Sequence, residues 1–129
     1  MNMLYLLFGG GVGAILRYLI GLGIMKKYPT PAIPVAMLTV NLLGSFGLGF
    51  FFSIRYAALP QNAYEDPFYL LIGIGFFGAF TTFSTFSVEA VDLIRHKKFG
   101  KAAVYILLSI VGSIVCFLIG FCSGLLVVR

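Results

Sequence analysis

The stretch from Gly78 to Ser87, GAFTTFSTFS, places three threonines, two serines and three phenylalanines in ten residues of an apolar segment. Hydroxyl groups can donate hydrogen bonds to an anion. A phenyl ring has a positive edge, so ring edges can meet an anion without a full positive charge. Phe83 and Phe86 are three residues apart and share a helix face. The stretch therefore predicts a path for a small solute. An anion is a plausible solute, but these residues do not specify which anion, and a neutral solute is equally allowed.

The same residues predict an interruption of the helix after Gly78. Serine and threonine lower helix propensity and can bond backbone groups that a break sets free. A broken membrane helix exposes carbonyl oxygens at one half-helix end and amide groups at the other. These two ends are candidate cation and anion sites. The alternative for Phe83 and Phe86 is simple packing in lipid or in the protein core.

Other polar side chains also fall inside apolar segments. Asn41 lies near the middle of one segment, and Tyr105, Ser109 and Ser113 follow one another at intervals of four in another. This interval places the three hydroxyls on one helix face. Polar groups at membrane depth are costly unless they have partners. The alternatives are a hydrogen bond between helices for Asn41 and bonds to the local helix backbone for the hydroxyls.

The composition indicates a membrane protein. Of the 129 residues, 60% are hydrophobic and 10% are charged, whereas soluble domains carry about 25% charged residues. The mean hydropathy is +1.06. We therefore expect an all-α integral membrane protein with a single domain over residues 1–129. The net charge of +5 is explained better by loops that set membrane topology than by nucleic-acid binding.

Four segments are long enough to cross a bilayer, which takes about 20 apolar residues. They are residues 3–25, 34–54, 68–94 and 102–128. Arg17 lies in the first segment, where it could snorkel to the interface or draw anions toward a path. Two GxxxG pairs have the spacing that lets helices approach closely, and the alternative is that glycine is common in membrane helices in any case. These pairs are Gly9 with Gly13, and Gly120 with Gly124.

Basic residues are distributed unevenly between the two sides of the membrane. The first and third loops share one side and carry Lys26, Lys27, Arg95, Lys97, Lys98 and Lys101. The second loop and the C-terminus carry Arg55 and Arg129. The positive-inside rule places the larger group in the cytoplasm and both termini outside.

Enzyme chemistry is not indicated, because the sequence shows no nucleophile–base pair and no metal cluster. A small four-helix multidrug exporter would need a carboxylate in the first helix, where the charged residue is Arg17. The lack of a carboxylate at mid-membrane favours passive permeation. A structural subunit without transport is the alternative from another class, and it predicts that Phe83 and Phe86 tolerate other large apolar residues.

Three strings resemble the Fluc/CrcB family of fluoride ion channels. They are GGGVGAILRY, VNLLGSFGLG and, most specifically, GAFTTFSTFSVE. The resemblance covers essentially the whole chain, with four spans in the expected order. It implies an antiparallel dimer with two fluoride pores, a broken third helix and a central sodium ion.

The resemblance also implies roles at matching positions. The fluoride path would comprise Asn41, Phe83, Ser84, Thr85, Phe86, Tyr105, Ser109 and Ser113. Backbone carbonyls of Gly78 and Thr81 would hold sodium. Arg17 matches the arginine near the aqueous entrance, and Glu89 matches a glutamate to which we assign no role.

We therefore expect passive export of fluoride across a microbial plasma membrane, most simply a bacterial one. The family also contains paired subunits of fixed opposite orientation. A chain that inserts both ways should have balanced loops, so the basic bias favours a paralogous partner in a heterodimer. The presence of all the pore residues in one chain favours a homodimer.

Overall fold

The computed structural model describes residues 2–29, 33–58, 61, 63–81 and 83–128. Within these residues, four helical stretches are long and apolar enough to cross a membrane. They are Met3–Lys27, Val35–Tyr56, Tyr69–Arg95 and Phe99–Val128. The predicted all-α architecture with four spans is confirmed, and each boundary lies within a few residues of its expected place. The chain is thus built as a multi-pass membrane protein.

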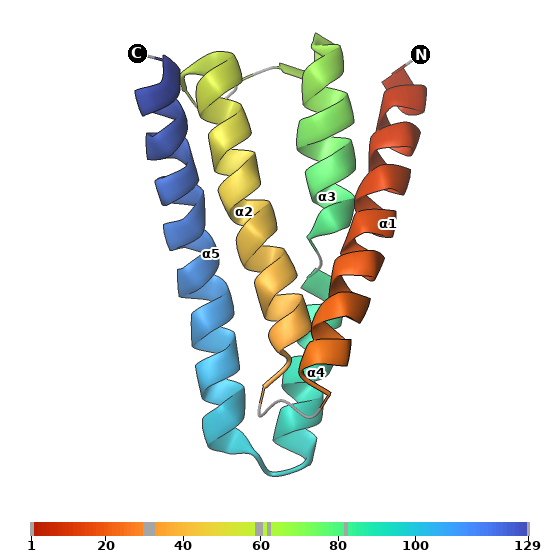
Figure 1. Cartoon of the computed structure of the whole chain (residues 1–129), viewed down its shortest axis with the longest axis vertical. Coiled ribbons are helices and arrows are strands. Elements are labelled where there is room, and N and C mark those ends of the chain that lie inside the picture. The colour runs from red at the N-terminus through yellow and green to blue at the C-terminus, as the bar shows by residue number, and fades with distance from the viewer. Residues whose placement is uncertain (1, 30–32, 59–60, 62, 82, 129) are drawn as a thin grey trace.

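The first, second and fourth spans are each a single helix, whereas the third span consists of several elements (Figure 1). The single helices are α1 (Asn2–Lys27), α2 (Val35–Tyr56) and α5 (Phe99–Val128). A short 3-10 helix, η1 (Ala63–Glu65), precedes the third span. This span consists of the π-helix η2 (Tyr69–Phe76), α3 (Phe77–Phe80) and α4 (Phe83–Arg95).

The backbone leaves helical geometry between α3 and α4. Thr81 is extended, with φ −84° and ψ 158°, and its N–H still donates to the carbonyl oxygen of Phe77 at 3.0 Å. Thr82, where the sequence also predicts the interruption, lies outside the described residues. A full break of the third helix therefore stays a prediction.

Close contacts at glycines join the helices in two pairs. A Cβ at Gly49 would collide with the carbonyl oxygen of Phe117, and one at Gly120 with that of Phe46, so α2 and α5 touch backbone to backbone. A similar contact joins α1 to the third span, where Gly9 faces the carbonyl of Leu71. In lipid there is no hydrophobic force that drives helices together, so close packing at small residues stabilises their association instead. Both predicted GxxxG pairs thus lie at helix contacts, because Gly13 and Gly124 are equally enclosed.

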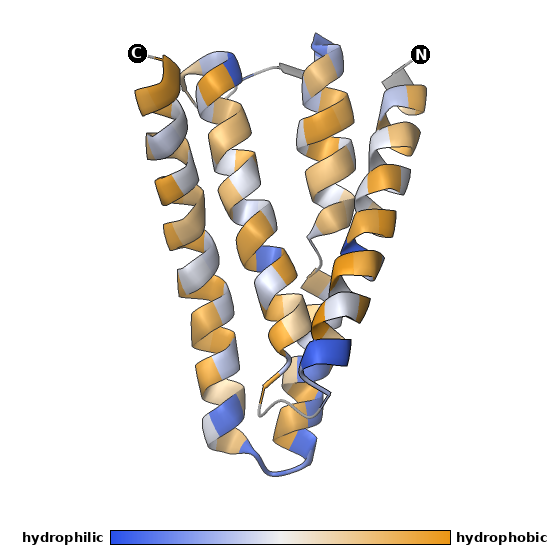
Figure 2. Cartoon of the chain, in the orientation of Figure 1, coloured by the Kyte–Doolittle hydropathy of each residue, from blue (hydrophilic) through white to orange (hydrophobic). Residues whose placement is uncertain are grey.

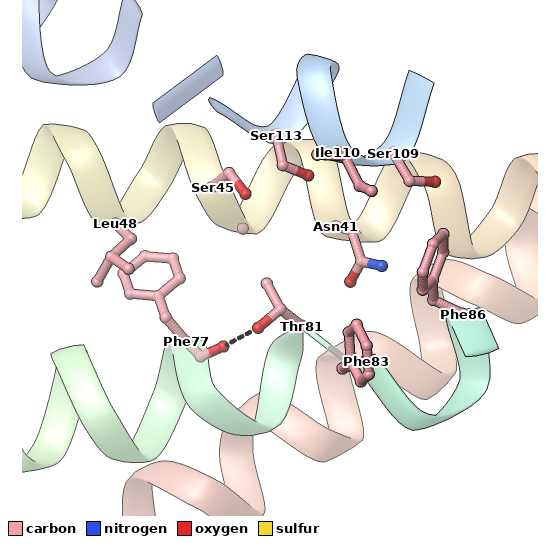
Figure 3. Close-up of a pocket in the computed structure, with 11 residues that line it drawn as sticks. Asn41, Ser45, Leu48, Phe77, Thr81, Phe83, Phe86, Ser109, Ile110 and Ser113 are labelled. Atoms are coloured by element: carbon pink, nitrogen blue, oxygen red, sulfur yellow. Dashed lines mark hydrogen bonds between the residues drawn. The ribbon is translucent and has the colours of Figure 1, made fainter. Parts of the chain in front are cut away.

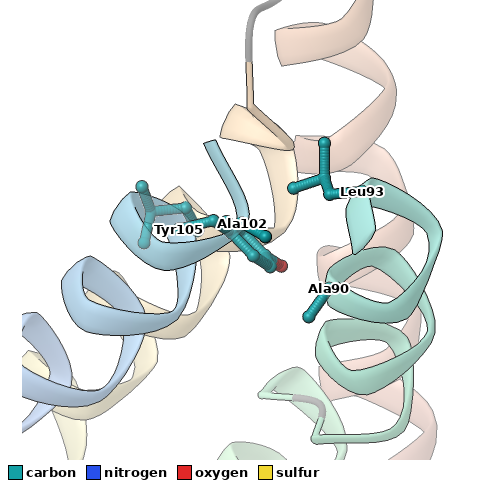
Figure 4. Packing of buried hydrophobic residues seen from close by; sticks show 5 residues of the cluster. Ala90, Leu93, Ala102 and Tyr105 are labelled. Carbon is teal, nitrogen blue, oxygen red and sulfur yellow. The ribbon is translucent and has the colours of Figure 1, made fainter. Parts of the chain in front are cut away.

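A small apolar cluster closes the bundle at the end opposite the chain termini (Figure 4). Its buried members are Leu38, Ala90, Leu93, Ala102 and Tyr105. They come from α2, α4 and α5, so this cluster ties α4 to the α2–α5 pair. Toward the termini, the α2–α5 pair and the pair of α1 with η2 and α3 diverge (Figure 1).

Hydrophilic residues gather at both ends of the bundle (Figure 2), and the two ends differ in charge. At the end with the termini, Asp66 accepts hydrogen bonds from the Tyr56 hydroxyl at 2.7 Å, from Arg55 Nε at 3.2 Å and from the Phe68 N–H at 3.0 Å. The bond from Tyr56, followed by those from Arg55 and Phe68, lowers the pKa of Asp66 below its ordinary 3.8 although partial burial opposes them. Asp66 therefore neutralises Arg55 and caps the third span.

At the opposite end, the basic side chains of the two loops are exposed. These residues are Lys26, Lys27, Arg95, Lys97, Lys98 and Lys101. Arg129 of the other end lies outside the described residues. The end with the basic loops thus exposes six lysine and arginine side chains, whereas Arg55 at the other end is paired with Asp66 at 3.2 Å.

The glycine contacts predict a specific stability defect. We expect Gly120→Ala to lower the free energy of unfolding by about 1–3 kcal/mol, because the added methyl group would push α5 away from α2. Thermal unfolding of the detergent-solubilised protein, followed by circular dichroism, measures the effect. Gly23→Ala is the matched control, since a Cβ there meets nothing within 4 Å. Equal melting temperatures for the two variants would contradict the proposed contact.

Candidate functional site

A cavity of about 310 Å³ lies between α2, the α3–α4 region and α5 (Figure 3). Its lining residues are Asn41, Gly44, Ser45, Leu48, Phe77, Thr81, Phe83, Phe86, Ser109, Ile110 and Ser113. The lining is mostly apolar, with a few amide and hydroxyl groups directed into it. It contains no charged side chain among the described residues.

Helical spacing explains how the polar groups converge. Asn41 and Ser45 are four residues apart on α2, and Ser109 and Ser113 are four apart on α5, so each pair shares a face. Thr81 closes α3, and its hydroxyl donates to the carbonyl oxygen of Phe77 at 2.8 Å. The side chains of three separate elements therefore meet around one space.

Phe83 and Phe86 lie in the first turn of α4. Their ring centroids are 5.7 Å apart and their ring planes are inclined by 43°. The Phe86 ring also contacts the Tyr105 ring at 5.4 Å, which anchors it to α5. Phe83 is 79% exposed. A ring that lines the cavity and yet is this exposed means that the cavity opens toward the outside of the single chain.

Ser109 provides the clearest unsatisfied group in the cavity. Its Oγ is buried and makes no hydrogen bond of good geometry within the described residues, and the group nearest to pairing with it is the Tyr105 hydroxyl one turn away, which already donates to Glu89. A buried hydroxyl without a partner costs free energy of about 1–3 kcal/mol. The hydroxyl can donate to a ligand that enters the cavity, and an anion would be such a ligand.

Tyr105 differs from the other two hydroxyl residues of its stripe. It is fully buried and its hydroxyl donates to Glu89 Oε2 at 3.0 Å, so it does not belong to the cavity lining. Glu89 in turn lines a smaller, more enclosed cavity of about 140 Å³ with residues of α1 and α2, among them Met25 and Val35. The hydrogen bond joins α4 to α5 directly beside Phe86.

The structure brings together some of the residues singled out in the sequence and leaves others apart. Those that line the cavity are Asn41, Thr81, Phe83, Phe86, Ser109 and Ser113. Those outside its lining are Arg17, Gly78, Ser84, Thr85 and Tyr105. The roles predicted for both groups, namely fluoride path, aqueous entrance and sodium binding, stay predictions.

Sequence reasoning missed several residues of the site. Ser45 and Leu48 lie four and seven positions after Asn41, and this helical spacing is a signal that could have found them. Phe77 lies one turn before Thr81 and could have been found in the same way. Glu89 lies outside this cavity and was noted in the sequence without a role; a carboxylate in a membrane helix needs a partner, and the structure shows that the partner is Tyr105.

Comparison with known proteins gives a family. Residues 4–121 match the family described as CrcB-like protein, Camphor Resistance (CrcB). The chain belongs to the CrcB family. CrcB relatives include a protein of Halalkalibacterium halodurans named fluoride-specific ion channel FluC 1, which is 61% identical over 94% of this chain and 95% of its own length.

Two further CrcB relatives come from other bacteria. A protein of Carboxydothermus hydrogenoformans, also named fluoride-specific ion channel FluC 1, is 38% identical over 93% of this chain and 90% of its own length. A protein of a Ruegeria species named fluoride-specific ion channel FluC is 40% identical over 96% of this chain and 94% of its own length. The resemblance inferred from the motifs is thus confirmed.

The hydrogen bond between Tyr105 and Glu89 predicts a measurable contribution to stability. We expect Tyr105→Phe to lower the free energy of unfolding by about 1.5–3 kcal/mol, because the Glu89 carboxylate loses its donor inside the bundle. Thermal unfolding in detergent measures the loss. Tyr64→Phe is the control, since Tyr64 is exposed and its ring contact with Tyr69 does not need the hydroxyl. A Tyr105→Phe variant as stable as this control would show that the bond contributes nothing.

Proposed function

We propose that this CrcB chain is a subunit of a passive, fluoride-selective channel. The observation that carries the proposal is the cavity, which gathers the rings of Phe83 and Phe86 and the hydroxyls of Ser109 and Ser113 around Asn41. The names of the relatives support fluoride as the transported ion. No bond is made or broken in such a function, so the protein is not an enzyme.

The chemistry of the lining suits a small anion that must lose its water. Hydroxyl and amide groups donate hydrogen bonds, and phenyl edges present partial positive charge. Because no carboxylate lines the cavity among the described residues, an anion would not be repelled by charge. We assign the path to Phe83, Phe86 and Asn41 first, with Ser109 and Ser113 as donors. Ser84, Thr85 and Tyr105 are flanking groups, and Arg17 attracts anions toward the entrance.

An antiparallel dimer with two pores is the assembly that we propose. The strong exposure of Phe83 and the open side of the cavity support a second chain that completes each pore. The chain has only four spans within its described residues, whereas many transporters contain two oppositely oriented halves in one chain. An oppositely oriented second chain would supply the missing half.

The channel would export fluoride from a microbial cell. Hydrogen fluoride is a weak acid that crosses lipid as a neutral molecule and ionises in the cytoplasm, which traps the anion. An inside-negative potential of about 100 mV contributes about 2.3 kcal/mol per charge to its exit. We place the protein in the plasma membrane of a bacterium, which agrees with the sources of its relatives.

A sodium ion at the centre of the dimer is part of the same proposal. The backbone carbonyls of Gly78 and Thr81 would hold it, at the interruption between α3 and α4. The residues fit this role, because Gly78 is exposed and a Cβ there meets nothing within 4 Å, so an ion can approach the backbone. Carbonyl oxygen is a suitable ligand for such a hard cation.

A heterodimer is the second candidate assembly. Six exposed basic residues lie at one end, whereas at the other end Arg55 is paired with Asp66. This asymmetry favours one orientation in the membrane. An antiparallel dimer would then need a related chain with the opposite preference.

Fluoride efflux from liposomes that contain the purified chain alone tests the function. We expect rapid fluoride release, detected by a fluoride electrode, and no comparable chloride release. Phe83→Ile and Phe86→Ile should each reduce fluoride efflux at least about tenfold, which corresponds to 1.4 kcal/mol, because a branched alkyl group lacks the positive ring edge. Phe99→Ile is the control, since Phe99 lies at the start of α5 outside the cavity lining.

The outcomes separate the two assemblies. Efflux from the chain alone would exclude an obligatory partner. Efflux that appears only after a paralogous chain is added would establish the heterodimer. A well-folded chain without efflux in either case, or full activity in both cavity variants, would contradict the channel.

The proposed binding of sodium predicts an effect on thermal stability that can be measured without transport. We expect the purified protein to melt several degrees higher in sodium chloride than in N-methylglucamine chloride, because an ion that binds only the folded assembly stabilises it by mass action. The melting temperature measured by circular dichroism at equal ionic strength reports the difference. Identical melting in both salts would argue against a bound sodium ion.

A further inference from the structure

The cavity has two unlike ends (Figure 3). One end carries the rings of Phe83 and Phe86 beside Ser109. The other end is lined by Phe77 and Leu48, and Leu48 comes two turns after Asn41 on α2. The second end therefore faces the membrane side of the chain termini, away from the basic loops.

The Phe77 ring packs against α2 in the space beside Gly47, which we call its seat. A Cβ at Gly47 would lie 2.6 Å from Phe77 Cε1 and 2.7 Å from Cζ, so the ring fills the space that this glycine leaves. The ring of Phe76 meets Phe77 edge to face at 5.0 Å and 88°. On the backbone side, Thr81 bonds the Phe77 carbonyl through both its N–H and its hydroxyl.

Beyond Phe77, aromatic groups continue toward the same membrane side. Phe51 is buried on α2, and its ring approaches Gly73 of η2. The Phe52 ring stacks with Tyr69 at 6.2 Å. The polar lining of the cavity thus ends where Phe77 begins, and no further hydroxyl of the cavity lies past it within the described residues.

The volume of the cavity makes this apolar end important. The cavity of about 310 Å³ is open on one side of the single chain, and this is many times the roughly 10–15 Å³ of probe volume that one water molecule needs. The walls that this chain supplies around the open part therefore do not distinguish small anions by size. Discrimination requires a narrower place, and apolar constrictions are known to control passage by excluding water.

We infer that Phe77, seated on Gly47 and opposed by Leu48, closes the cavity at its second end and restricts which anions cross it. The inference rests on the proposed channel function. The ring acts as a steric and apolar barrier, so shortening it should admit larger anions. Pushing the ring further into the cavity should instead slow the passage of fluoride.

Fluoride and chloride efflux, measured side by side in liposomes, tests both the effect of shortening the ring and the effect of pushing it into the cavity. Phe77→Ala should increase chloride efflux relative to fluoride efflux by about 10–200-fold, the range by which fitted pockets discriminate similar ligands. Phe77→Leu, which retains most of the volume, should change this ratio much less. Gly47→Ala should lower fluoride efflux without adding chloride efflux. Phe99→Ala is the matched control and should leave both rates at the wild-type level.

A double-mutant cycle tests the seat without any transport measurement. Gly47→Ala should lower the melting temperature of the wild type, because its methyl group meets the ring. It should have little effect in the Phe77→Ala background, where the ring is absent. Equal effects of Gly47→Ala in both backgrounds would show that the ring does not occupy this seat.

The results separate this inference from the function on which it rests. Wild-type protein that releases no fluoride, alone or with a paralogous chain, would overturn the channel and with it the barrier. Wild-type protein that releases fluoride while Phe77→Ala keeps the wild-type ratio of chloride to fluoride would overturn the barrier alone. An increased chloride share in Phe77→Ala, together with the coupling to Gly47, supports the inference.

Discussion

Close contact between helix backbones at glycine is the constraint on which this fold depends. The carbonyl oxygens of Phe46 and Phe117 occupy the space beside Gly120 and Gly49, and Leu71 does the same beside Gly9. These contacts make two tight helix pairs, α2 with α5 and α1 with η2 and α3. The helices within a pair leave no room between them, so the open space of the molecule falls between the pairs. The cavity lies there.

The way in which α4 starts then determines what faces the cavity. Thr81 is extended and α4 begins at Phe83, so both phenyl rings fall in the first turns of the new helix. The apolar cluster around Leu38 and the bond from Tyr105 to Glu89 hold α4 against the α2–α5 pair. A small set of contacts at one end of the bundle therefore controls the position of the rings.

Much of this arrangement could be read from the sequence. Apolar length predicted the four spans, glycine spacing predicted the contacts, and the intervals from Ser109 to Ser113 and from Phe83 to Phe86 predicted shared faces. The sequence did not reveal the bond between Tyr105 and Glu89 or the seat of Phe77 on Gly47, because both depend on how two helices are rotated against each other. Fluoride came from resemblance, since hydroxyls and ring edges alone allow other anions. The second chain and the carbonyl-bound sodium ion that we propose would leave little trace in side-chain patterns.

The unequal lengths of the helices have a mechanical consequence. With 30 residues, α5 is about 45 Å long, whereas α2 with 22 residues is about 33 Å long. The hydrocarbon core of a bilayer is about 30 Å thick. No single thickness matches both members of this pair, so α5 must tilt or extend into the headgroups. Lys101 in its first turn can follow by snorkelling. A change in bilayer thickness would therefore change the tilt of α5. Because a short loop connects α5 to α4, it would also shift α4, the helix that carries Phe83 and Phe86.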